Sequence, residues 1–131
     1  MHFIVLLGRI LYSAIFIASG IGHFTRDTID YSAMHGVPIA SFLVPVMGII
    51  AILGALSVLF GYRARLGAWL LVIFLVPVTL MMHKFWGMED GMMASMQHSM
   101  FLKNISMLGA ALLITYFGSG PLSLDKEKRK K

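Results

Sequence analysis

The sequence has no cysteine and little charge. Of its 131 residues, 13% are charged and only six are acidic. Without cysteine, disulfide frameworks, thiolate metal sites and CxxC redox chemistry are excluded within this chain. Soluble domains carry about a quarter charged residues. The low charge and the 58% of hydrophobic residues therefore indicate a membrane protein, and the length allows one domain.

Acidic residues are missing from every long apolar stretch of the sequence. Serine–histidine–acid catalysis needs a buried acid to orient its base, and carboxylate-pair hydrolysis needs two placed acids, so neither is expected. The net charge of +5 comes mostly from the last six residues. Such a tail is typical of attraction to anionic lipid, and it makes no case for nucleic-acid binding.

Four apolar stretches are long enough to cross a hydrocarbon core, which takes about 20 helical residues. They cover residues 3–23, 39–60, 66–86 and 99–117. The connections are short, which predicts an all-α, polytopic, up-down bundle of four transmembrane helices. We expect one domain over residues 1–125 and a basic cytoplasmic tail over 126–131. The first stretch lacks the basic start of a signal peptide and is interpreted as a retained span.

The distribution of lysine and arginine predicts the orientation. Seven basic residues lie in the second connection, residues 61–65, and in the tail, which belong to the same side. By the positive-inside rule, both termini are expected in the cytoplasm. The segment between the third and fourth spans then faces outward.

Small residues repeat at helical spacing in three of the spans, a pattern that lets another helix approach closely. We expect all three stripes to lie in helix contacts. They are Ala14, Ala18 and Gly22; Gly48, Ala51, Gly54 and Ala55; and Ser106, Gly109 and Ala110.

Polar residues gather at the expected outer ends of three spans. Asn104 lies about 9 Å deeper than His98 along a helix. Such a cluster suits a quinone head group, with a histidine exchanging protons. The alternative is an interfacial belt in which lysines extend to the membrane surface beside histidines and Trp86. The cluster comprises His23, His83, Lys84, His98, Lys103 and Asn104.

Arg9 lies about two helical turns inside the first span. Its helical face is continued by Tyr12, Ser13, Phe16, Gly20 and His23. A polar face turned to the bundle interior would suit a ligand cavity or a proton path. The alternative is an arginine that extends to cytoplasmic phosphates. If Arg9 is buried, it needs carbonyls, hydroxyls or a ligand as partners, because the spans contain no acid.

Methionines recur at every fourth position after the third span. Thioethers together with an imidazole suit Cu(I), so an outer-face copper site is an alternative function. Methionine is also a flexible apolar filler, and packing as a lid over the bundle is the favoured interpretation. The candidate metal ligands are Met88, Met92, Met93, Met96 and His98.

Several motifs occur in an order that resembles the DoxX family of bacterial inner-membrane proteins. The first span holds Gly8-Arg9 and closes on Gly22-His23-Phe24, and LFGYRAR (59–65) forms the second connection. FLKN (101–104) opens the fourth span, and GSGPLSLD (118–125) follows it. The resemblance runs through essentially the whole chain.

The resemblance implies a four-helix component of an oxidoreductase, with quinone-linked subunits among the relatives. Arg9, Lys103 and Asn104 match polar positions of the family, whereas an acid common near Ala51 is missing here, which weakens a proton-coupled mechanism. The favoured function is therefore a quinone-binding or redox-partner subunit in the bacterial inner membrane. In it, His83 or His98 exchanges protons, and the remaining cluster residues and Arg9 bind the cofactor. The alternatives are copper handling and a non-catalytic assembly module, with a redox protein or a second copy as partner.

Overall fold

The computed structural model describes residues 1–89 and 91–125. The expected basic tail, residues 126–131, lies outside the described residues. The five helices are α1 (His2–Gly22), α2 (Arg26–Met34), α3 (Ala40–Phe60), α4 (Ala64–Met82) and α5 (Met92–Phe117), and the described part of the chain has no strand.

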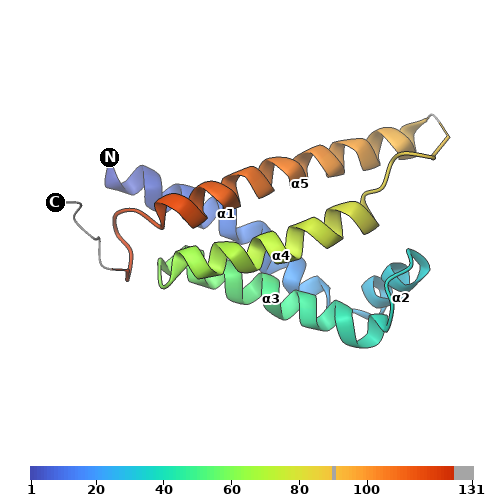
Figure 1. Cartoon of the computed structure of the whole chain (residues 1–131), viewed down its shortest axis with the longest axis horizontal. Helices are drawn as coiled ribbons and strands as arrows, with labels where there is room; N and C mark the ends of the chain where they lie inside the picture. Colours follow the sequence, from blue (N-terminus) through green and yellow to red (C-terminus); the bar gives the residue numbers. More distant parts are fainter. Residues whose placement is uncertain (90, 126–131) are drawn as a thin grey trace.

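Four of these helices, α1, α3, α4 and α5, are long and apolar enough to cross a membrane, which confirms the expected all-α, four-span protein. The helix α3 packs against both α1 and α4, and α4 packs in turn against α5 (Figure 1). The short helix α2 lies beside the start of α3, at one end of the bundle.

Glycines set the closest helix contacts. A methyl group added to Gly20 of α1 would lie 2.8 Å from the carbonyl oxygen of Gly48 of α3. One added to Gly54 of α3 would lie 2.8 Å from the carbonyl oxygen of Gly67 of α4. In a membrane such close packing replaces the hydrophobic effect as the force that joins helices. The predicted stripe on α3 is buried, as expected.

The other two small-residue stripes are mostly exposed in the part of the chain that the structure describes. Ala14 and Ala18 on α1 are exposed, as are Ser106 and Gly109 on α5. The helix α1 packs instead through the opposite face, which carries Arg9, Ser13, Phe16 and Gly20. The spacing of small residues along the sequence is the same in the packed and in the exposed stripes, so only the tertiary arrangement distinguishes them.

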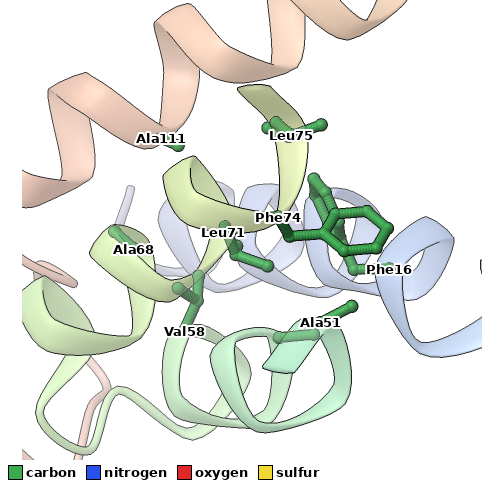
Figure 2. Close-up of a cluster of buried hydrophobic side chains, with 9 residues drawn as sticks. Phe16, Ala51, Val58, Ala68, Leu71, Phe74, Leu75 and Ala111 are labelled. Atoms are coloured by element: carbon green, nitrogen blue, oxygen red, sulfur yellow. The ribbon is translucent and has the colours of Figure 1, made fainter. Parts of the chain in front are cut away.

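The core lies where α1, α3 and α4 meet (Figure 2). The rings of Phe16 and Phe74 pack edge to face, with centroids 6.2 Å apart. Leu71, Leu75 and Val58 are fully buried beside them. Ala51, Ala55, Ala68 and Ala111 complete the cluster.

The helices differ from the prediction at the end of α4, at the start of α5 and in the first connection. The helix α4 ends at Met82 rather than at residue 86. The helix α5 begins at Met92 rather than at residue 99, so the methionines from Met92 onward continue α5 beyond the end of α4 (Figure 1). The first connection contains a helix, α2, whose start is capped by Thr25, which accepts a hydrogen bond from the Thr28 N–H at 3.3 Å. Threonine at a helix start is a local signal that the sequence already carried.

Candidate functional site

The end of the bundle with the α3–α4 turn is closed by residues 118–125, which follow α5 and fold back over that turn; we name this segment the clasp. The Leu124 N–H donates to the Phe60 carbonyl at 3.0 Å, and the Asp125 N–H donates to the Gly61 carbonyl at 2.6 Å. These bonds tie the end of α5 to the end of α3.

The carboxylate of Asp125 caps helix α4. It accepts hydrogen bonds from the backbone N–H groups of Arg63 at 2.7 Å and Ala64 at 3.0 Å. Helix starts leave such N–H groups without partners, and an acidic side chain there is also favoured by the helix dipole. Asp125 thus supplies, from a distant part of the chain, a cap that Arg63 itself does not provide.

Arg9 is buried against the clasp. Its side chain is 5% exposed, and Nη2 donates to the carbonyl oxygens of Pro121, at 3.2 Å, and Leu122. Among the described residues, Nε and Nη1 have no partner, and neither has the hydroxyl of Ser13 one turn further along α1. Arg9 therefore uses backbone carbonyls, one of the partners expected for a buried arginine, and it lies at the opposite end of the bundle from the predicted polar cluster.

The other end, which we name the Met-rich end, holds the end of α4, residues 83–89 and the first turns of α5. Of the six residues predicted to cluster there, His23, His83 and Asn104 are at least half-buried, whereas Lys84, His98 and Lys103 are exposed.

His23 turns its ring onto Phe74, with the centroids 5.3 Å apart. Its Nδ1 lies 2.6 Å from the Ser19 carbonyl oxygen. A carbonyl only accepts hydrogen bonds, so Nδ1 carries the proton and donates. In the neutral ring, Nε2 is then left as an acceptor.

His83 joins the end of α4 to α5, because its Nδ1 donates to the Gln97 side-chain oxygen at 3.1 Å. Asn104 lies about 10 Å deeper along α5 than Gln97. Asn104 is 4% exposed, whereas the buried side-chain atoms that lack a partner in the described residues belong to Arg9 and Ser13.

The exposed members of the predicted cluster lie beside aromatic and methionine side chains. The Lys84 Nζ lies 5.9 Å from the Trp86 ring centroid, and the His98 ring lies 4.5 Å from that of Phe85. The Lys103 Nζ reaches to 3.5 Å from the Met100 sulfur, one turn closer to the Met-rich end. The Lys103 side chain thus extends along α5 toward the Met-rich end.

The candidate copper ligands lie mostly on exposed positions of the Met-rich end. Met88, Met92, Met93 and Met96 are exposed. Met96 and His98 point about 160° apart, because they are two residues apart on one helix. In the described residues, no three histidine or acidic side chains are grouped to hold a metal ion.

Two residues of the structure had no predicted role, and Tyr12, which was predicted on the Arg9 face, has a partner that was not predicted. Gln97 pairs with His83, and Asp125 caps α4. Tyr12 donates from its hydroxyl to the Met107 carbonyl at 2.7 Å, which ties α1 to α5. Asp125 lies within a motif that resembled the family, but no local pattern shows that it meets a helix start about 60 residues earlier.

Comparison with known proteins agrees with the architecture. The family model DoxX matches residues 4–84. The chain is 31% identical over 129 residues to the inner membrane protein YqjF of Escherichia coli K12, covering 97% of this chain and 93% of the relative. It is 28% identical over 126 residues to the inner membrane protein YphA of the same bacterium, covering 94% and 89%.

A third similarity is to the ER-derived vesicles protein ERV29 of Saccharomyces cerevisiae, 25% identical over 81 residues, covering 62% of this chain and 26% of that protein. No solved structure matches the chain. The family match spans more than half of the sequence and agrees with four membrane-length helices and with relatives from a bacterial inner membrane. The chain therefore belongs to the DoxX family of integral membrane proteins.

Proposed function

We propose that this DoxX-family protein is the membrane subunit of a quinone-linked oxidoreductase and binds a quinone-type head group at the Met-rich end. The observation that carries the proposal is the placement of a buried amide side chain, Asn104, at the same end of the bundle as the half-buried His23 and His83. An amide offers both a donor and an acceptor to a polar ligand.

The roles follow from the placement of the side chains. The Asn104 amide donates a hydrogen bond to one ring carbonyl. His83 and His23 exchange protons. The Nδ1 atom of His83 bonds to Gln97 and that of His23 to the Ser19 carbonyl, so the Nε2 atom of each ring is not used in these bonds. Reduction of a quinone takes two electrons and two protons. The electrons come from a partner redox protein, because the chain has no cysteine or other evident redox centre.

The test begins with protein purified in mild detergent, extracted with organic solvent and examined by mass spectrometry. We expect a quinone to copurify, and Asn104→Leu to lower the bound amount while preserving the fold. Ser106→Ala, on the exposed side of the same helix, is the matched control and should retain the ligand. If no quinone copurifies and none binds when added, the proposal is wrong.

We also propose that both termini lie in the cytoplasm, on the support of the basic residues around the α3–α4 turn. The chain has no cysteine, so single introduced cysteines report position directly. Ser95→Cys should react with a membrane-impermeant maleimide in spheroplasts, and His2→Cys only after the membrane is opened. The reverse pattern would contradict this orientation.

A further inference from the structure

A groove of about 430 Å³ runs between α3 and α4 at the clasp end. Leucine and phenylalanine side chains form its walls, and most of them are exposed toward the membrane. They are Leu53, Leu56 and Phe60 from α3, Leu66 and Leu70 from α4, and Leu124 from the clasp.

The groove exists because the helices cross on small residues. Ser57 and Gly67 line it where α3 and α4 approach, close to the contact between Gly54 and Gly67. The Ser57 hydroxyl donates to the Tyr62 carbonyl at 2.6 Å and lies 3.1 Å from that of Arg63. The floor is therefore shallow, and its Ser57 hydroxyl is already engaged by a backbone carbonyl, which suits an apolar occupant.

A fixed cation lies at the mouth of the groove. Arg63 is exposed and lines the groove, and its guanidinium carbon lies 5.7 Å from the Tyr62 ring centroid. Its backbone is in the left-handed region, with φ of 48°, and its N–H is held by Asp125 at 2.7 Å. The base of this side chain is thus anchored, while its charged end remains at the level of the helix ends.

We propose that this groove binds one acyl chain of an anionic phospholipid, with the lipid phosphate at Arg63. An apolar channel that faces the membrane and ends in an arginine matches the order of groups in a phospholipid, and arginine pairs well with phosphate. A helix of a second copy, about 10 to 12 Å wide, would not enter a channel that is lined by single side chains of two adjacent helices. The site lies at the other end of the bundle from the quinone proposal and does not depend on it.

Native mass spectrometry of the full chain tests the proposal with phosphatidylglycerol and phosphatidylcholine that have identical acyl chains. We expect more phosphatidylglycerol than phosphatidylcholine to be retained. Arg63→Asn should reduce the retention of phosphatidylglycerol about five-fold, which is the contribution of one basic side chain near an anionic lipid surface. Asparagine tolerates the left-handed conformation, so the variant removes the charge without new strain. Arg63→Lys should keep most of the retention.

Two controls separate this site from general attraction. Arg26→Gln makes the same change in net charge on α2, at the Met-rich end, and should leave retention unchanged. Leu70→Trp fills the groove and should lower retention of both lipids, whereas Ile73→Trp, on the exposed face of α4 outside the groove, should not. Equal retention of the two lipids, or no effect of Arg63→Asn or of Leu70→Trp, would overturn the proposal.

Discussion

The clasp end and the Met-rich end of the bundle are held by different kinds of contact. At the clasp end, backbone hydrogen bonds and the carboxylate of Asp125 join segments about 60 residues apart, over a buried Arg9. At the Met-rich end, the side chains of His83 and Gln97 join α4 to α5, and most neighbouring aromatic and methionine side chains are exposed. Regions with few buried contacts open at the lowest free energy, so the Met-rich end is the one suited to rearrange around a ligand.

The clasp also solves a problem of membrane proteins. Backbone groups near the hydrocarbon region must find partners within the protein. The start of α4 and the end of α3 find theirs in residues 124 and 125. Two carbonyls and two N–H groups of the α3–α4 turn are thereby satisfied by a segment that has no regular structure of its own.

Replacement of the clasp carboxylate should have the largest effect. Asp125→Ala removes two charge-assisted hydrogen bonds and the negative charge near Arg9, so we expect the free energy of unfolding to fall by about 2 to 4 kcal/mol. Titration with SDS in mixed micelles measures it. The same change at the Met-rich end, Glu89→Ala, should stay within about 0.5 kcal/mol, because Glu89 is exposed. Similar losses for the two variants would break the distinction between the ends.

A pair of glycine variants separates backbone strain from contact with the clasp. Gly61 and Gly87 have φ of 64° and 84°, so alanine is strained at both by about 1 to 2 kcal/mol. At Gly61 the added methyl would also meet Ser123 and Arg9, whereas at Gly87 it meets nothing within 4 Å. Gly61→Ala should therefore destabilise by about 1 kcal/mol more than Gly87→Ala in the same titration. Equal losses of unfolding free energy for the two variants would show that Ser123 and Arg9 move aside at no cost.

The smallest expected effect is at the contact between α4 and α5. A double-mutant cycle of His83→Ala and Gln97→Ala should give a coupling energy of about 0.5 to 1 kcal/mol, the range for one partly exposed neutral hydrogen bond. The cycle uses the same unfolding measurement. A coupling above about 2 kcal/mol would mean that the Met-rich end is as firmly joined as the clasp end.

The spans were predictable because hydropathy is a local property. A run of about 20 apolar residues must become a helix in a membrane whatever it packs against, since its backbone needs internal partners. The same reasoning limited the partners of a buried Arg9 to carbonyls, hydroxyls or a ligand, because no span offers it an acid, and the structure shows carbonyls. The polar cluster was predictable only as a set of residues at one end, and the structure turns Asn104 inward and Lys103 outward on neighbouring positions of one helix.

Sequence alone therefore determined the class of protein: four apolar spans, an all-α membrane bundle and its family motifs. Tertiary structure decided which small residues pack, since the stripe on α3 is buried and those on α1 and α5 are exposed. It also decided that Asp125 caps α4, that Arg9 faces the clasp and that a groove opens beside Arg63. The physical reason is the sequence separation of the interacting groups. Helix formation in lipid depends on neighbouring residues, whereas caps, grooves and buried partners depend on distant segments that only the fold brings together.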